Sequence, residues 1–303
     1  MSLAHHHDHH HHPTHQKAFA LGILFNLLFI AIEIVYGLLA HSLALIADAG
    51  HNLSDVLSLL LAWGAGVLAN RKPTLKRTYG FRRATILASL VSATLLLVAL
   101  GAIAWEAIER LRAPTPVHGD MVMLIAGIGV IINTLTALLF FSGRNHDLNV
   151  KAAFLHMAAD AAVSFGIVIS GLAIMLTGWL WLDPATSLIV VTVILIASLG
   201  LLRDSLNLAI DAVPKDIDPY QVIEFLKNQH GVSNVHDFHI WGMSTTHAAL
   251  TVHLVIPGAP RDDRFLANLA HQLHHQFGIE HSTIQIERGD SSQTCTSGSC
   301  HCI

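Results

Sequence analysis

The stretch from Leu43 to Ala69 reads LALIADAGHNLSDVLSLLLAWGAGVLA, and the rest of the chain is best interpreted from it. It is long and apolar enough to cross a hydrocarbon layer, which takes roughly 20 residues. It nevertheless contains Asp48, His51 and Asp55. Ionisable side chains inside a membrane span are costly and mark functional sites by default. The stretch therefore predicts a transmembrane helix that carries a polar site.

The composition of the whole chain supports a membrane protein. Of its 303 residues, 52% are hydrophobic and 13% are charged, and the mean hydropathy is +0.53. Soluble domains carry about 25% charged residues. The net charge of -4 argues against a nucleic-acid partner, because that role needs a basic surface. We therefore expect the lipid bilayer, and not nucleic acid, to surround or contact the chain.

Six long apolar stretches predict six transmembrane helices, at residues 18–39, 43–69, 86–108, 121–141, 152–180 and 185–202. Lys and Arg concentrate in the loops that follow the second and fourth stretches. Basic loop residues stay on the cytoplasmic side of a membrane. Both termini are therefore predicted to be cytoplasmic, in a multi-pass protein.

After the last span, the sequence predicts a small α+β domain. A helical pattern at 220–229 precedes β-like patterns at 234–243 and 247–257, a second helix at 262–277 and a short strand at 283–287. The order αββαβ is typical of a ferredoxin-like α+β fold. We assign a His-rich segment to 1–16, the membrane domain to 17–207, the cytosolic domain to 208–289 and a Cys-containing tail to 290–303. A core this small favours pairing with a second copy, hence a homodimer.

Two spans carry the same pair of residues at the same spacing. His51 and Asp55 are four residues apart, as are His156 and Asp160, and this spacing places both side chains on one helix face. If the two helices face each other, two imidazoles and two carboxylates form a tetrahedral site suited to Zn²⁺. With four protein ligands no position is left for a reacting water, which favours binding over hydrolysis. The alternative is that both histidines only form structural hydrogen bonds.

Two further acids lie inside spans. Asp48 is one helical turn from His51, and it could orient that imidazole, relay protons or pack against a helix; we favour the orienting role. Glu33 either forms an interhelical hydrogen bond or lines a polar path, and the sequence leaves both readings open.

The motifs around these residues resemble those of the cation diffusion facilitator family. The resemblance rests on SLALIADAGHNLSD at 42–55, HMAAD at 156–160, VHDFHIW at 235–241 and STIQIE at 282–287, and it is closest to the zinc branch. It implies that His51, Asp55, His156 and Asp160 bind the transported ion. It further implies that Zn²⁺ leaves the cytoplasm in exchange for protons across a bacterial inner membrane. Some members have a second, histidine-based site in the loop after the second span; the corresponding KRTYGFRRAT at 76–85 contains no histidine, so that site is not carried over.

The resemblance also implies regulatory zinc binding by the cytosolic domain, and the grouping of its ligands remains open. Strand alternation predicts that His236 and His239 point to opposite faces of the sheet. The histidines could instead be half-buried structural residues, and the tail thiols could form no defined site. The candidates are His236, His239, His253, His281, Glu287, Cys295, Cys300 and Cys302.

Two histidine-rich segments remain. The tract at 5–15 is interpreted as a metal-collecting segment.

The HxxHH pattern at 271–275 resembles one histidine box of membrane oxygenases. The alternative function is therefore a membrane-bound metalloenzyme of oxygenase or protease type. That alternative lacks partner boxes and an HExxH motif. No GxxxxGK[ST] loop is present either, so the proton gradient is the expected energy source.

Overall fold

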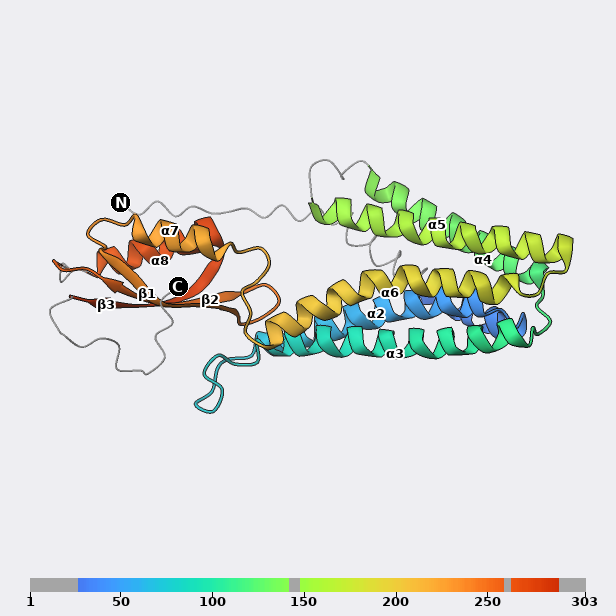
Figure 1. Cartoon of the computed structure of the whole chain (residues 1–303), viewed down its shortest axis with the longest axis horizontal. Coiled ribbons are helices and arrows are strands. Elements are labelled where there is room, and N and C mark those ends of the chain that lie inside the picture. Colours follow the sequence, from blue (N-terminus) through green and yellow to red (C-terminus); the bar gives the residue numbers. More distant parts are fainter. Residues whose placement is uncertain (1–26, 142–147, 259–262, 289–303) are drawn as a thin grey trace. The chain divides into compact units, whose positions relative to one another are not determined.

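The computed structural model describes residues 27–141, 148–258 and 263–288 (Figure 1). An apolar helix at Leu27–Leu39 is followed by five helices that are long and apolar enough to span a membrane. They are α2 (Leu43–Ala69), α3 (Ala84–Arg112), α4 (Gly119–Phe141), α5 (Leu148–Thr177) and α6 (Leu182–Ala209). This part of the predicted fold is confirmed. The helices extend past several predicted ends because polar residues continue them beyond the apolar run, as Arg110 and Arg112 do in α3.

The chain divides into two compact units, and α2, α3 and α6 each contribute to both. The first unit comprises Met1–Leu57 with Leu95–Ala197, and the second comprises Ser58–Thr94 with Ser198–Ile303. All residues of the two predicted His–Asp pairs belong to the first unit, and the small α+β domain belongs to the second. Each unit is described by itself below.

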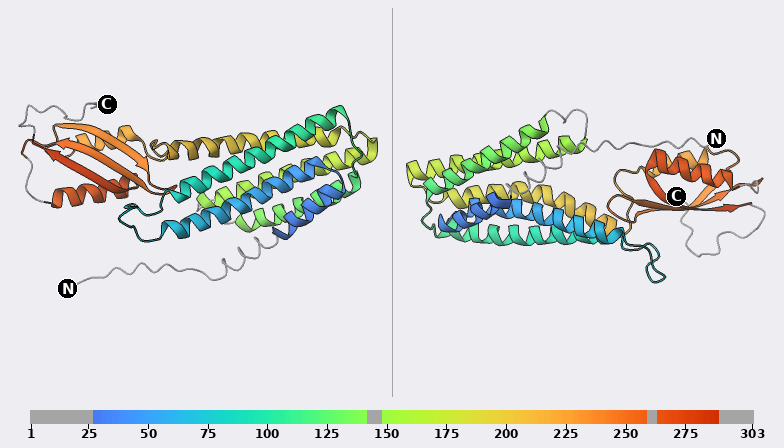
Figure 2. Two further views of the ribbon diagram at one scale, coloured as in Figure 1. Left: turned by 90° about the horizontal axis from the view of Figure 1, so that it is seen from below. Right: turned by 180° about the vertical axis from the view of Figure 1, so that it is seen from behind.

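Glycines bring α4 and α5 unusually close, and the two helices run side by side in both figures (Figures 1 and 2). A Cβ added to Gly119 would lie 2.7 Å from the carbonyl oxygen of Gly171, and a Cβ added to Gly171 would lie 2.8 Å from the backbone nitrogen of Met123. Small residues allow helix backbones to approach in this way. The tight contact with α4 fixes the position of α5, which carries His156 and Asp160.

The start of α2 is held by a residue from the start of α6. The buried Asp183 accepts hydrogen bonds from the Ser42 hydroxyl and from the Leu43 backbone N–H, the latter at 2.7 Å. A carboxylate there satisfies donors that a helix N-terminus leaves free. Helix α6 begins two residues before Pro184, whereas the last predicted stretch began at residue 185; proline is compatible with a first helical turn. This long-range cap fixes the helix that carries His51.

The C-terminal domain has the predicted αββαβ order. It contains α7 (Pro219–Lys227), β1 (Asn234–Gly242), β2 (Ala248–Val255), α8 (Arg264–Phe277) and β3 (Ile279–Glu287). The sheet order is β1-β2-β3, with β1 antiparallel and β3 parallel to β2. Helices α7 and α8 cover one face (Figure 1), and their buried leucines pack against alternate residues of β2. The other sheet face carries the strand histidines.

A β-bulge corrects one prediction. His236 pairs with His253, whereas His239 pairs with Thr251, so three steps along β1 match two along β2. Residues that pair with alternate positions of one strand share a face, and the extra residue lies around Asp237, whose φ is 49°. His236 and His239 therefore lie on the same face of the sheet. The predicted opposite orientation is wrong because simple alternation assumes an uninterrupted strand.

Candidate metal sites

Helices α2 and α5 bring the two predicted His–Asp pairs together. The Nε2 atom of His51 lies 3.6 Å from Asp55 Oδ2 and 3.6 Å from Asp160 Oδ1. The Nε2 atom of His156 lies 3.0 Å from Asp55 Oδ2 and 3.7 Å from Asp160 Oδ2. The four side chains thus form a closed ring in which each imidazole lies between two carboxylates. We call these four residues the membrane ring.

The spacing in the membrane ring matches that of a tetrahedral ligand set. Zn²⁺ binds imidazole nitrogen and carboxylate oxygen at about 2.0–2.1 Å, which places neighbouring ligand atoms of a tetrahedron about 3.3–3.4 Å apart. The observed nitrogen–oxygen distances, from 3.0 to 3.7 Å, bracket that value. The His51 and His156 rings are nearly perpendicular, at 84°, with centroids 6.0 Å apart. Ligand atoms of His51, His156 and Asp160 lie within 4.8 Å of one another, and Asp55 joins this set through its contacts with the two histidines.

Exposure differs across the membrane ring. The side chain of Asp160 is 5% exposed and that of His51 is 18% exposed, whereas Asp55 and His156 reach 34% and 45%. One side of the ring is therefore enclosed by protein, and the other side is accessible in the described structure. An ion could enter on the Asp55–His156 side and be stripped of water as it reaches Asp160.

Beside the enclosed side lie the acids Asp48 and Glu33, both fully buried. Asp48 Oδ2 accepts a hydrogen bond from Ser164 of α5 at 2.8 Å. No hydrogen-bond partner reaches His51 Nδ1 within the described part of the chain. The orienting bond from Asp48 to His51 that the sequence analysis favoured is therefore not formed in this structure, and Asp48 instead links α2 to α5. No pattern in the sequence pointed to Ser164 as its partner.

A second cluster lies on the open face of the C-terminal sheet. Ligand atoms of His236, His253 and Glu287 all lie within 4.8 Å of one another. The two Glu287 oxygens divide between the histidines: Oε2 is 3.0 Å from His236 Nε2, and Oε1 is 3.0 Å from His253 Nδ1. Partial burial acts to raise the pKa of Glu287, but contacts with His236 and His253 and a hydrogen bond from Gln285 outweigh it, and the net pKa is lowered. The carboxylate is thus kept ionised, the form that binds metal.

The sequence analysis overlooked Asp237 as a participant in this cluster. Its Oδ2 lies 3.2 Å from His253 Nε2, and its Oδ1 lies 3.3 Å from His239 Nε2. The bulge directs this carboxylate toward the histidine face, so His239 joins the edge of the cluster through Asp237. The motif HDxH at 236–239 was the available signal. It places Asp237 near the histidines only because the bulge shifts the register of β1.

Of the remaining candidates, the described residue His281 does not join this cluster. His281 pairs with Ala249 near the beginning of β3, whereas Glu287 pairs with Val255 at its end, so the two lie far apart along the strand. The three tail cysteines and the histidine tract at 5–15 lie outside the described residues.

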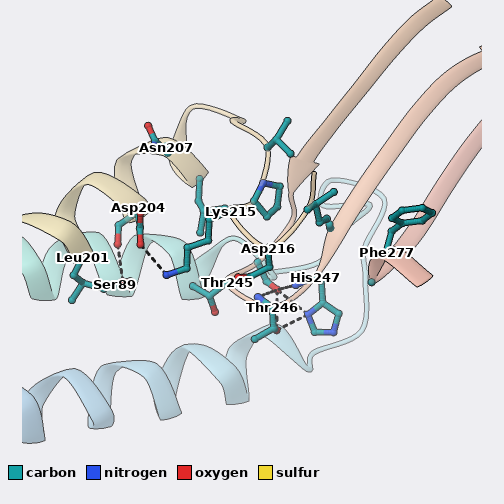
Figure 3. Close-up of a pocket in the computed structure, with 18 residues that line it drawn as sticks. Ser89, Leu201, Asp204, Asn207, Lys215, Asp216, Thr245, Thr246, His247 and Phe277 are labelled. Atoms are coloured by element: carbon teal, nitrogen blue, oxygen red, sulfur yellow. Dashed lines mark hydrogen bonds and ion pairs between the residues drawn. The ribbon is translucent and has the colours of Figure 1, made fainter. Parts of the chain in front are cut away.

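A pocket of about 460 Å³ lies in the second unit (Figure 3). Its lining includes Lys215, whose ammonium is 3.1 Å from Asp204; this contact raises the pKa of Lys215. His247, also in the lining, accepts or donates a hydrogen bond with Ser244 at 2.8 Å. None of the residues predicted to bind metal lines this pocket.

The helices are long enough to span a membrane, and the membrane ring lies between two of them. Together with the small α+β domain, they define a multi-pass membrane protein with a polar site between its helices. Residues 19–208 match the family described as the cation efflux transmembrane domain, and residues 214–289 match the one described as the cation efflux protein cytoplasmic domain. The chain therefore belongs to the cation efflux, or cation diffusion facilitator, family, and the resemblance found in the sequence is confirmed.

Curated relatives match over nearly their whole length. The zinc transporter ZitB of Escherichia coli is 39% identical over 99% of this chain and 96% of its own length. The metal cation efflux system protein CzcD of Cupriavidus metallidurans is 34% identical, over 97% of this chain and 92% of its own. A Bacillus subtilis protein named cadmium, cobalt and zinc/H(+)-K(+) antiporter is 33% identical, over 94% and 92%.

Proposed function

We propose that this protein is a secondary transporter that exports Zn²⁺ from the cytoplasm in exchange for protons, with the membrane ring as its transport site. The observation that carries the proposal is the closed set of four nitrogen–oxygen contacts between α2 and α5, at 3.0 to 3.7 Å. Two neutral imidazoles and two carboxylates balance the charge of a divalent ion, and their geometry suits zinc. The relatives named as zinc transporters support the choice of ion.

Proton exchange follows from the chemistry of these ligands. Zn²⁺ binds neutral imidazole and ionised carboxylate, so its binding releases any protons that the ring holds. Protons that return to the ring compete with the metal and promote its release. An obligatory alternation of metal and protons at one site gives antiport. The relative named as an H(+)-K(+) antiporter is consistent with this coupling.

The finer assignments concern the cytosolic domain and the membrane. We place both termini in the cytoplasm of a bacterial inner membrane, in agreement with the basic loops and with the domain that matches a cytoplasmic one. We assign a regulatory zinc site to His236, His253 and Glu287, whose donor atoms are close enough to share one ion. A homodimer joined through this small domain completes the proposal.

The metalloenzyme alternative has no support. Both matched domains are those of cation efflux proteins, and the relatives above are transporters or efflux proteins by name. His271, His274 and His275 lie on the exposed side of α8. The α8 histidines face solvent, whereas the membrane ring is enclosed on one side by protein. This difference favours a transporter over a metalloenzyme.

The decisive experiment is zinc flux in proteoliposomes loaded with a zinc-sensitive dye and a pH dye. His156→Ala and Asp160→Asn should abolish zinc flux, because each removes one of four ligands. His118→Ala and Asp120→Asn serve as matched controls, since both side chains are exposed at the start of α4 and lie outside the ring. Wild-type flux in the ring variants would eliminate the proposed site.

The same vesicles test the coupling. An imposed pH gradient should drive zinc flux in the wild type, and a zinc gradient should move protons in the opposite direction. Zinc flux that ignores the pH gradient and gives no pH signal would mean uniport and would contradict the exchange mechanism.

A further inference from the structure

A second polar group lies beside the membrane ring and contributes no residue to the candidate metal groups of the described residues. Glu33, on the first apolar helix, and Asp48, on α2, are both 0% exposed. Asn52 donates to Glu33 Oε2 at 3.4 Å, and Ser164 donates to Asp48 Oδ2 at 2.8 Å. Each carboxyl thus has one oxygen satisfied by a neutral donor.

The second oxygen of each carboxyl lacks a hydrogen-bond donor among the described residues. These two atoms, Glu33 Oε1 and Asp48 Oδ1, are both buried. The two carboxyls lie close enough to interact with each other. Ionised carboxylates only accept hydrogen bonds, so a bond between two carboxyls requires a proton on one of them. A single proton would satisfy both orphaned oxygens.

The surroundings contain no fixed positive charge that could replace this proton. Glu33 interacts with Asp48 and Asn52, and Asp48 also interacts with Ser164, His51 and Asp160. No Lys or Arg is among these partners in the described residues. Two unpaired carboxylates side by side in a membrane interior would be very costly. A proton shared by the pair would remove most of this cost.

We propose that Glu33 binds a proton, shared with Asp48, that leaves when a divalent metal occupies the membrane ring and returns when the metal departs. The proposal rests on the proposed function and adds a proton site outside the metal ligands. A divalent ion bound at His51 and Asp160 would favour ionised carboxylates nearby, because charges interact strongly in a poorly solvated interior. The O–H bond of Glu33 breaks, its electron pair stays on the carboxylate, and the proton passes to water.

The test is the number of protons released per zinc by the full-length protein in detergent, measured with a pH dye in weak buffer. Glu33→Gln should still bind zinc but release about one proton fewer than the wild type. Glu33→Asp, which restores an acid, should return most of the missing proton. Glu106→Gln, at a half-exposed acid paired with Arg110, is the matched control and should release the wild-type number.

The outcomes separate this proposal from the proposed function. A wild-type proton count in Glu33→Gln would overturn the inference and leave metal–proton exchange intact. A wild type that releases no protons would contradict the exchange itself. If Glu33→Gln does not fold, infrared difference spectra of the wild type and of Glu33→Asp decide the question. Zinc should remove the carbonyl signal of a protonated carboxylic acid, and that signal should shift in frequency in Glu33→Asp; a signal that is absent, or identical in the two proteins, would refute the protonated pair.

Discussion

Asp183 offers a quantitative test of how α2, the helix that carries His51 and Asp55, is held. In Asp183→Ala, the Leu43 N–H and the Ser42 hydroxyl lose their buried acceptor. A buried donor left unsatisfied costs about 1–3 kcal/mol, and loss of a negative charge at a helix N-terminus costs about 0.3–1 kcal/mol more. The hydroxyl can turn toward another acceptor, so only the Leu43 N–H bears the full penalty. We expect the free energy of unfolding to fall by about 1–4 kcal/mol.

Two further variants provide a partial loss and a control for this prediction. Asp183→Asn should lose about half as much, because its amide can still accept from Leu43 N–H and donate to the Ser42 oxygen. Ser187→Ala is the control: its hydroxyl donates to the Leu43 carbonyl at 3.4 Å, a long and weak bond, so the change should cost less than about 1 kcal/mol. The assay is equilibrium unfolding in mixed micelles, followed by far-ultraviolet circular dichroism.

Zinc flux measured on the same variants links the cap to function. Asp183→Ala should lower flux, since α2 carries half of the membrane ring, whereas Ser187→Ala should not. Equal stability of Asp183→Ala and Ser187→Ala would refute the reasoning that this carboxylate anchors α2 to α6.

Three other predictions follow from the packing, the cytosolic cluster and the N-terminal segment. Gly171→Ala should destabilise the protein and reduce zinc flux by forcing α4 from α5, whereas Gly166→Ala, with no atom within 4 Å of the added Cβ, should be neutral or slightly stabilising in the same unfolding assay. The pKa of Glu287 is below its ordinary value of 4.5, so its stabilising effect is present above that pH and is lost as the pH falls below it; Glu287→Gln should flatten this part of the melting-temperature profile. Deletion of 5–15 should lower zinc flux only at scarce zinc, and loss of flux at saturating zinc would contradict a collecting role.

Much of the fold could be read from the sequence because it follows from local physics. Membrane spans need long apolar runs, and the αββαβ domain needs alternation and turn residues, both of which are written along the chain. The four ring residues could be predicted for the same reason. His51 and Asp55, like His156 and Asp160, share a helix face by spacing alone, and unpaired they would be too costly in lipid.

Other features depend on contacts between distant segments, which spacing does not encode. The pairing of Asp183 with the start of α2 joins residues about 140 positions apart, and the Ser164–Asp48 bond joins α5 to α2. The bulge at Asp237 reverses the orientation of one strand histidine relative to simple alternation, because a register shift becomes visible only when the partner strand is in place. Sequence periodicity thus determined the helices, the strands and the residues of the membrane ring. The tertiary structure alone decided which polar groups face one another, since a buried carboxyl takes its partner from whatever helix packs against it.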